Sequence, residues 1–351
     1  MDTFHAYRIF NEGKTVSGRF VEMNLNELDS GEVVIRTAYS SVNFKDALAA
    51  TGAGKIIRRF PCVGGVDAAG VVESSQDARF QPGDEVVITG YEMGVAHDGG
   101  YAEYVRVPAA WVVRLPPGLT MFEAMALGTA GFTAALAIHR LEQNDLKPEN
   151  GRVLVTGATG GVGSLAIQML AQLGYRVVAL TGKDSEHEYL KSLGANEILP
   201  RSAIDASSNR ALERAQWAGA LDAVGGETLS WLVRSMLQNG AIASFGNTGG
   251  AELHISVYPF ILRGVRLLGV DSAATLMPLR EKIWKRLAGE LRPKMLGSVA
   301  RTVAFSENRL KRRSNIHLDG AGQAALGLPI PASFCACWKR WETVCGLRVA
   351  G

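Results

Sequence analysis

The chain has 351 residues, of which 47% are hydrophobic and 20% are charged, a composition typical of globular proteins that bury a sizeable core. The formal net charge is only +3, and Lys and Arg are mostly interspersed with Asp and Glu, which excludes a nucleic-acid binder from our expectations. At roughly 150 residues per domain, this length predicts about two domains.

The N-terminal residues lack the charged and then apolar segments of a secretory signal. The uncharged run at residues 124–138 is shorter than the ~20 residues of a membrane span and is rich in Ala, Gly and Thr, which predicts a buried helix. The four cysteines form no disulfide pattern. We therefore expect a cytoplasmic protein without a membrane partner.

The first 120 residues contain many short β-rich segments, which turns of Gly, Pro and Asp such as residues 82–84 separate from one another. This pattern predicts a small β domain at residues 1–120. The strand candidates are residues 33–36, 69–72, 85–88 and 102–105.

From Arg152 onward, short apolar strands alternate with helical patterns that end at Gly174 and Gly194. This alternation predicts βαβ units, and therefore an α/β fold with a doubly wound parallel Rossmann sheet, within residues 121–295. The predicted strands are residues 153–155, 176–180, 219–224, 241–245 and 265–270, and the predicted helices are residues 164–173 and 186–193.

Residues 155–163 read Val-Thr-Gly-Ala-Thr-Gly-Gly-Val-Gly between a predicted strand and a predicted helix, the context of a dinucleotide-binding turn. Gly157 permits the tight turn, Gly160 and Gly161 let the backbone approach a pyrophosphate, and Gly163 lets helix and strand pack closely. The helix N-terminus then offers N–H groups to the phosphates. Thr159 and Val162 belong to the same predicted site; a purely structural turn is the alternative.

The end of the second Rossmann strand indicates which nucleotide binds. NAD sites usually place Asp or Glu there, about 20 residues after the glycines, whereas this strand ends at Thr181 and is followed by Gly182 and Lys183. A hydroxyl and a cation suit the 2′-phosphate of NADPH, although Asp184 comes next and Lys183 could instead be a solvated loop residue. Arg201, past the next strand, is a weaker second candidate for the phosphate.

The glycine string also fits short-chain dehydrogenases, but those need Lys four residues after a catalytic Tyr, and none of the eight tyrosines here has it. Their nucleotide turn also opens the chain. A β-rich first domain followed by a Rossmann unit instead resembles the medium-chain dehydrogenase/reductase superfamily. The stretches that carry this resemblance are residues 43–46, 64–72, 82–86 and 127–134.

In the zinc alcohol dehydrogenases of that superfamily, Cys stands at the position of Asn43 and His at that of Val66, and a four-cysteine lobe holds a second zinc. None of these ligands is in this sequence, so we expect no metal. The sequence is similar to the zinc-free quinone oxidoreductase/acrylyl-CoA reductase subgroup from the N-terminus to about residue 305. The closest matching stretches are residues 41–48, 51–58, 182–195, 217–220 and 259–265.

This resemblance implies a GroES-like catalytic domain at residues 1–120, a Rossmann NADPH-binding domain at 121–295, a return to the first domain from 296, and a homodimer through the Rossmann sheet edge. It implies hydride transfer from NADPH to the C=C bond of an α,β-unsaturated thioester such as acryloyl-CoA, giving propionyl-CoA. The enolate charge then requires preorganised donors. An NADPH:quinone oxidoreductase and a non-catalytic NADPH-binding protein are the alternatives.

The candidate catalytic residues lie where the relatives hold their metal. We expect Asn43 beside the nicotinamide, its amide donating to the oxyanion; a turn-forming Asn is the alternative. Lys45 and Asp46 are expected to form a polar pair next to it, or a plain salt bridge. Asp67 is either a proton relay or a strand-end cap.

The remaining candidates bind cofactor or substrate. Thr129 and Thr133 are expected near the nicotinamide, although helix capping also explains Thr129. A basic cluster is expected to recognise CoA phosphates, with a solvated surface patch as the alternative; it consists of Lys55, Arg58 and Arg59. Residues after the later Rossmann strands are expected to contact the nicotinamide: Gly246, Asn247, Gly269, Asp271 and Ser272.

The last segment departs from the family. Residues 300–305 begin as expected, but after Ser306 the resemblance stops. Residues 308–351 carry a basic run, three cysteines and two Trp without a helical or strand period. We interpret this tail as a shifted reading frame or a divergent end, which intact-mass analysis and sequencing of the coding DNA would distinguish.

Overall fold

The computed structural model describes residues 3–13, 15–205, 208, 210–305 and 324–327. These residues form two compact units. Unit 1 takes its described residues from Met1–Thr129, Ala273–Lys282 and Leu296–Gly351, and unit 2 takes them from Ala130–Ser272 and Ile283–Met295.

Unit 2 is built on a six-stranded parallel sheet with the order β11-β10-β9-β12-β13-β14. The chain winds outward in both directions from β9 and β12, as in a doubly wound Rossmann fold, and the predicted α/β class is confirmed. Its strands read as apolar runs because both faces are covered. They are β9 (Arg152–Val155), β10 (Arg176–Thr181), β11 (Glu197–Pro200), β12 (Trp217–Asp222), β13 (Met236–Ser244) and β14 (Arg266–Gly269).

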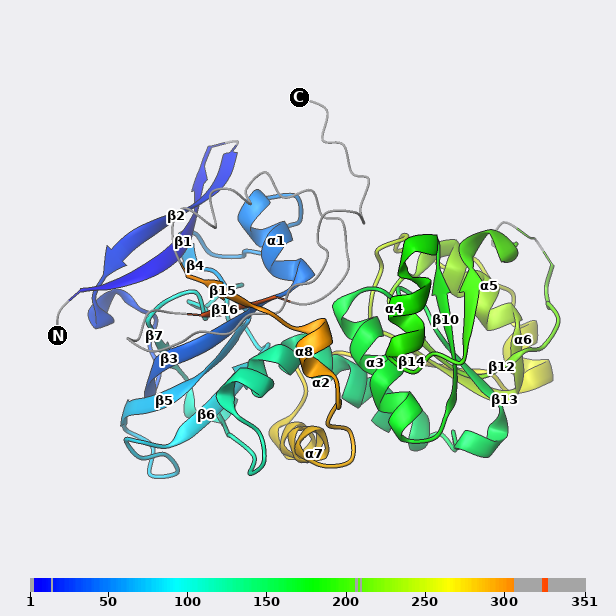
Figure 1. Ribbon diagram of the computed structural model, residues 1–351. Coiled ribbons are helices and arrows are strands. Elements are labelled where there is room, and N and C mark those ends of the chain that lie inside the picture. Colours follow the sequence, from blue (N-terminus) through cyan, green and yellow to red (C-terminus); the bar gives the residue numbers. More distant parts are fainter. Residues whose placement is uncertain (1–2, 14, 206–207, 209, 306–323, 328–351) are drawn as a thin grey trace. The chain divides into compact units, whose positions relative to one another are not determined.

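Helices cover both faces of this sheet, with α3 (Gly161–Gln172) and α4 (His187–Ser192) on one side and α5 (Gly226–Arg234) and α6 (Tyr258–Arg263) on the other (Figure 1). The predicted helices at 164–173 and 186–193 correspond to α3 and α4 and are confirmed. Short 3₁₀ turns complete the unit: η3 (Pro148–Asn150), η4 (Asp184–Glu186) and η5 (Arg201–Ala203).

Unit 1 is the GroES-like β domain, and it contains two sheets. The larger has the order β15-β16-β3-β5-β6-β8, with β7 also pairing with β3, and the smaller has the order β2-β1-β4. The strands are β1 (Phe4–Glu12), β2 (Thr15–Met23), β3 (Val33–Val42), β4 (Cys62–Val63), β5 (Asp67–Ser75), β6 (Glu85–Thr89), β7 (Tyr104–Val107), β8 (Val113–Arg114), β15 (Thr302–Ala304) and β16 (Ala324–Gly327). The helical elements are α1 (Phe44–Thr51), α8 (Leu296–Val299), η1 (Leu25–Glu27) and η2 (Ala109–Trp111).

Two helices carry the chain from one unit to the other, α2 (Met121–Glu142) and α7 (Met277–Ala288). By length and composition α2 could cross a membrane, but 78% of its most apolar window is buried within the protein. This burial is typical of a core helix and confirms the buried helix predicted at residues 124–138. The helix is kinked at Gly128, whose φ of 48° interrupts the helical backbone.

Two predictions for unit 1 need correction. The strand predicted at 102–105 lies at 104–107, because Ala102 makes only an isolated bridge to Ala6. Residues 324–327 form β16, which runs antiparallel to β3 and parallel to β15, although the sequence showed no strand period there. A four-residue strand is determined by its pairing partners more than by its own residues. The other tail residues, and the reading-frame hypothesis with them, lie outside the described residues.

Candidate functional site

The glycine-rich turn of unit 2 joins the end of β9 to the start of α3. Gly157 adopts a φ of 58°, which favours glycine, and its carbonyl accepts a hydrogen bond of 2.9 Å from the Gly160 N–H. A Cβ at Gly163 would lie 2.4 Å from the Gly157 carbonyl oxygen and 2.8 Å from the Ala158 Cα. The turn therefore requires glycine where the sequence predicted it, and it presents the N-terminal amides of α3 to an anion.

A buried carboxylate that the sequence analysis missed holds this turn against the neighbouring strand. Asp222, the fully buried last residue of β12, accepts from the Thr156 hydroxyl at 2.7 Å and from the Gly225 N–H at 3.0 Å. Burial raises the pKa of Asp222, and these hydrogen bonds oppose the rise. Asp222 thus ties together the ends of β9 and β12, where the strand order reverses and ligands bind in such sheets. The signal in the sequence that could have revealed Asp222 is an acidic residue at the end of an apolar strand.

Two cations converge beside the turn at the ends of β10 and β11. The Lys183 ammonium donates to the Thr159 hydroxyl oxygen at 3.3 Å. A Cβ on Gly182 would lie 3.4 Å from Arg201 Nε, so the Arg201 side chain lies against the residue that precedes Lys183. Arg201 makes no ion pair with any residue that the structure describes. The structure therefore brings together the residues predicted for a 2′-phosphate.

Asp184 follows Lys183 and is the carboxylate that could repel a 2′-phosphate at this site. The Asp184 side chain is 93% exposed and pairs with His187 at 3.5 Å. Among the other predicted residues, Gly246 and Asn247 follow β13, and a Cβ on Gly246 would lie 2.4 Å from the Ala223 carbonyl oxygen. Also at carboxyl ends of strands are Thr181 on β10, Gly269 on β14, and Asp271 and Ser272 after it, whereas Thr133 is buried in α2.

Unit 1 contains a second polar site, centred on Asp67. This fully buried residue begins β5 and accepts from the Thr129 N–H at 2.8 Å and the Thr129 hydroxyl at 2.6 Å. The kink at Gly128 exposes that N–H to capping, so Asp67 serves as the cap of the following helical segment. Ser41 and the Asn43 amide also donate to Asp67. These contacts fit the strand-end cap that was one of the two expectations for Asp67, and the proton relay stays a prediction.

The Asn43 amide is part of the network around Asp67. Its Nδ2 atom donates to Asp67 Oδ2 and to Ser41 Oγ, both at 2.9 Å. An amide NH₂ has two donors, and both are used within this network. These contacts do not favour an oxyanion donor at Asn43, and that role stays a prediction.

Asp46 is buried next to this network and does not pair with Lys45. Its carboxylate accepts from the Asn43 N–H at 2.8 Å and from the Val66 N–H at 3.1 Å, which fixes the start of α1. Lys45 is exposed and forms no ion pair with the described residues, so the predicted Lys45–Asp46 pair is wrong. Burial raises the pKa of Asp46 to about 7, and the nearby charge of Asp67 also raises it.

The raised pKa of Asp46 predicts how stability depends on pH. The folded protein retains a proton that the unfolded chain releases above about pH 4, so the contribution of Asp46 to stability is present at low pH and is lost as the pH rises to about 7. Asp46→Asn removes this titration, and we expect its free energy of unfolding to fall less than that of the wild type across this window. Urea denaturation at several pH values measures it; the exposed Asp145→Asn is the matched control. Equal pH slopes for Asp46→Asn and wild type would refute the assignment.

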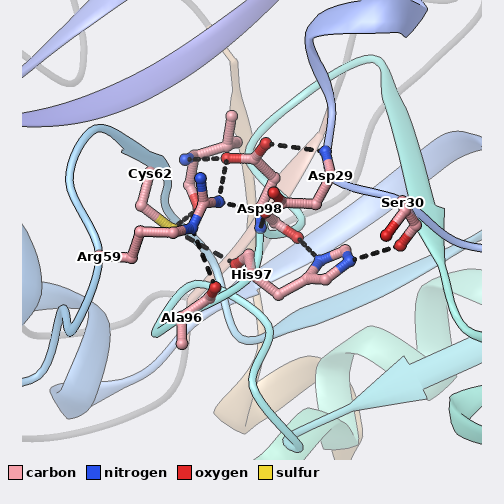
Figure 2. Close-up of polar contacts among 8 residues, drawn as sticks. Asp29, Ser30, Arg59, Cys62, Ala96, His97 and Asp98 are labelled. Atoms are coloured by element: carbon pink, nitrogen blue, oxygen red, sulfur yellow. Dashed lines mark hydrogen bonds and ion pairs between the residues drawn. The ribbon is translucent and has the colours of Figure 1, made fainter.

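The predicted basic cluster is largely occupied by structural contacts. Arg59 forms an ion pair with Asp29 and donates to the Ala96 carbonyl at 3.1 Å (Figure 2). Arg58 pairs with Glu92 at 3.2 Å, but both side chains are exposed. Arg59 therefore links loops of unit 1, which disfavours its predicted role in phosphate binding, while Arg58 and the exposed Lys55 remain accessible.

The contacts around Arg59 include residues to which the sequence analysis assigned no role. Asp98 is buried and accepts from the Val63 N–H at 2.8 Å, and its own N–H donates to Asp29 at 2.7 Å. The ring nitrogens of His97 lie 3.0 Å from the Asp98 carbonyl oxygen and 3.1 Å from that of Ser30 (Figure 2). Burial raises the pKa of the Cys62 thiol beside them to about 12, which makes the thiol unreactive. We therefore interpret this cluster as a structural one that holds the loops of unit 1 together.

A dinucleotide turn on a doubly wound sheet, together with a GroES-like unit that carries a buried polar network, defines a nucleotide-dependent oxidoreductase of two domains. The family model of the alcohol dehydrogenase GroES-like domain matches residues 29–117, and that of the zinc-binding dehydrogenases matches residues 161–287. Within the described residues, no group of three or more His, Cys, Asp or Glu could hold a metal ion.

Comparison with individual proteins identifies the subgroup within this class of oxidoreductases. The chain is 48% identical to YhfP of Bacillus subtilis, which is named a presumed quinone oxidoreductase, over 87% of this chain and 92% of that protein. It is 46% identical to the acrylyl-CoA reductase AcuI of Ruegeria pomeroyi over 82% and 87% of the two chains. The crystal structure of the YhdH oxidoreductase of Salmonella enterica in complex with NADP matches with a TM-score of 0.88 and 41% identity, covering 93% of this chain and all of that one. The chain therefore belongs to the zinc-free quinone oxidoreductase/acrylyl-CoA reductase subgroup of the medium-chain dehydrogenase/reductase superfamily.

Proposed function

We propose that this protein is an NADPH-dependent reductase of the C=C bond of an α,β-unsaturated thioester, with acryloyl-CoA as the simplest substrate and propionyl-CoA as its product. The observation that carries the cofactor assignment is the convergence of Lys183 and Arg201 beside the glycine-rich turn. The thioester is favoured because relatives at 46% identity are named acrylyl-CoA reductases.

The residues of unit 2 fit the cofactor. At Gly163 and Gly246 an added Cβ would meet backbone atoms of the glycine-rich turn and of Ala223, so glycine at these positions allows the close packing that shapes the turn and the loop after β13. The N-terminal amides of α3 bind the pyrophosphate, and Lys183 and Arg201 bind the 2′-phosphate through charge-assisted hydrogen bonds. The loops after β13 and β14 hold the nicotinamide end. NADPH, when bound, supplies the hydride, and the protein supplies orientation and electrostatics.

Unit 1 supplies the groups for the substrate. Because the Asn43 amide is committed to Asp67 and Ser41, we assign the stabilisation of the enolate charge to Lys45. Its exposed ammonium lies in the first turn of α1 and has no ion-pair partner among the residues described. A cation near a developing oxyanion stabilises it through a charge-assisted hydrogen bond. We retain Lys55 and Arg58 for the CoA phosphates.

Kinetics with a panel of substrates tests this proposal. We expect kcat/KM for NADPH oxidation to be far higher with acryloyl-CoA than with a benzoquinone. The reverse order would favour an NADPH:quinone oxidoreductase, which the name of the Bacillus relative supports. NADPH binding without turnover of either substrate would indicate a non-catalytic NADPH-binding protein.

We also propose that the protein is a cytoplasmic homodimer that associates through the β14 edge of the Rossmann sheet. β14 lies at one end of the strand order, and α6, which precedes it in the chain, exposes apolar side chains. The Ile261 and Leu262 side chains are 67% and 56% exposed, and exposed apolar patches of this kind mark protein interfaces.

Ile261→Asp is expected to shift the protein from dimer to monomer, because burying an unpaired charge at the centre of an interface costs free energy. Sedimentation velocity at several protein concentrations measures the change. Leu276→Asp, at a residue 78% exposed on unit 1, is the matched control and should remain dimeric. A wild-type protein that sediments as a monomer would refute the proposed assembly.

A further inference from the structure

One buried carboxylate in unit 2 lies where three neighbouring parallel strands end. Asp222 is the fully buried last residue of β12, and β12 lies between β9 and β13 in the sheet. On the β9 side, Asp222 Oδ1 accepts from the Thr156 hydroxyl at 2.7 Å. On the β13 side, the hydroxyl of Ser244, the last residue of that strand, lies 3.5 Å from Asp222 Oδ2. Asp222 therefore links the starting points of the loops that follow β9 and β13.

The backbone of the turn after β12 also bonds to this carboxylate. The Val224 N–H donates to Asp222 Oδ1 at 3.3 Å, and the Gly225 N–H donates to Oδ2 at 3.0 Å. Each carboxylate oxygen thus faces a backbone group that can only donate. The shape of this turn therefore depends on an acceptor at both positions, which an amide side chain cannot provide because one of its ends is a donor.

The loop at residues 246–250, which follows β13, is held by the turn after β12. The Gly249 N–H donates to the Val224 carbonyl at 2.7 Å, and the Thr248 hydroxyl donates to the Ala223 carbonyl at 3.2 Å. Both acceptors are backbone groups of the turn whose N–H groups bond to the carboxylate. A shift of this turn therefore moves the loop with it.

The glycine-rich turn is held by the same two partners from the other side. The buried Thr156 hydroxyl donates to Asp222 and accepts from the Ala223 N–H at 3.0 Å. A Cβ on Gly157, the next residue, would lie 3.1 Å from the Ala223 Cβ, so the two turns are closely packed. The separation between the glycine-rich turn and the loop at 246–250 is therefore set through Asp222 and the turn that it shapes.

We propose that Asp222 is a positioning residue that holds the glycine-rich turn and the loop at 246–250 at the separation that one NADPH molecule requires to bind both. Its fully buried side chain acts through these backbone segments and makes no contact with the cofactor. The inference rests on the proposed function, which assigns the pyrophosphate to the first segment and the nicotinamide end to the second.

The two halves of the cofactor test this proposal. Adenosine 2′,5′-bisphosphate carries the adenosine half, and reduced nicotinamide mononucleotide carries the nicotinamide half. Asp222→Asn keeps the size of the side chain but places a donor against one backbone N–H. We expect this variant to bind NADPH about tenfold less tightly, the scale of one hydrogen bond. Its affinity for each half should be unchanged, because a half ligand needs only one of the two segments in place.

Titration calorimetry with NADPH, and competition by each half, measure these affinities. A half ligand that loses as much affinity as NADPH would show that Asp222 supports only one segment, and would overturn the proposal. Unchanged NADPH affinity would overturn it as well. A wild-type protein that binds none of the three ligands would instead refute the proposed function.

Three further variants separate positioning from a folding defect. Thr156→Val removes the hydroxyl link to Asp222 but leaves the turn after β12 bonded to the carboxylate, and we expect the same loss confined to NADPH. This variant decides the question alone if Asp222→Asn does not fold. Thr156→Ser keeps the hydroxyl and should recover most of the affinity that Thr156→Val loses; no recovery would contradict the role of this link. Asp145→Asn, at an exposed residue of unit 2 that pairs with Arg266, is the matched control and should bind all three ligands as the wild type does.

Discussion

Replacing Lys183 and Arg201 together with alanine is expected to weaken NADPH binding by about 100-fold or more while NADH binding changes little. A hydrogen bond to a charged group contributes about 1.5–3 kcal/mol, and about 1.4 kcal/mol corresponds to a factor of ten in affinity. Both cations lie beside the glycine-rich turn, where only the nucleotide with a 2′-phosphate can use them. Equilibrium titration of the protein's fluorescence with each nucleotide measures the effect.

The control for this experiment removes the same charge elsewhere in unit 2. Lys191 is exposed and pairs with Glu188, and Arg210 is exposed and pairs with Glu213, so the double variant Lys191→Ala/Arg210→Ala should keep the nucleotide preference of the wild type. Equal losses of NADPH and NADH affinity in the Lys183/Arg201 variant would show that the two cations maintain the fold and do not read the 2′-phosphate.

Gly163→Ala is expected to destabilise unit 2 by about 1–3 kcal/mol, the usual effect of overpacking, and to abolish detectable NADPH binding. Alanine favours a helix over glycine by about 1 kcal/mol, but here its Cβ would lie 2.4 Å from the Gly157 carbonyl oxygen and 2.8 Å from the Ala158 Cα. Because both obstacles are backbone atoms of the turn, relief of the clash distorts the phosphate site. Thermal denaturation and NADPH titration measure the two effects.

Gly297→Ala provides the matched comparison for this variant. Gly297 is an exposed helical residue in α8 whose added Cβ would meet nothing within 4 Å, so alanine there should be neutral or slightly stabilising. If Gly163→Ala behaved like Gly297→Ala in stability and in NADPH binding, the close approach of α3 to the turn would not limit this site.

The nucleotide site was predictable because its determinants are local in sequence. Gly157 and Gly163 act through backbone conformation and close approach, and Lys183 follows directly from the end of a strand. Arg201 was predicted with less support, since it becomes part of the site only because β10 and β11 end side by side. Asp222 was missed because its partner Thr156 lies 66 residues earlier in the chain and follows β9, and the two meet only because β9 and β12 are neighbours in the sheet.

The polar network of unit 1 could not be predicted in the same way. The sequence singled out Asn43 and Asp67, but the direction of each hydrogen bond depends on Ser41 and on the Thr129 N–H, which the kink at Gly128 makes available. Adjacent residues on α1 have opposite environments, with Asp46 buried and Lys45 exposed. The Lys45–Asp46 contact that we inferred because the two residues are adjacent in sequence is therefore absent. The contacts of Asp67 depend on residues that are distant in sequence, so only the structure could reveal them.

The central claim, hydride transfer from NADPH to an activated C=C bond, is tested most directly by isotope tracing. The purified protein is incubated with acryloyl-CoA and NADPH carrying deuterium at the transferable C4 position, and the thioester product is examined by mass spectrometry and NMR. We predict one deuterium at the β-carbon of propionyl-CoA for each NADPH consumed. Unconsumed NADPH, or propionyl-CoA without the label from either C4 isotopomer, would contradict the account.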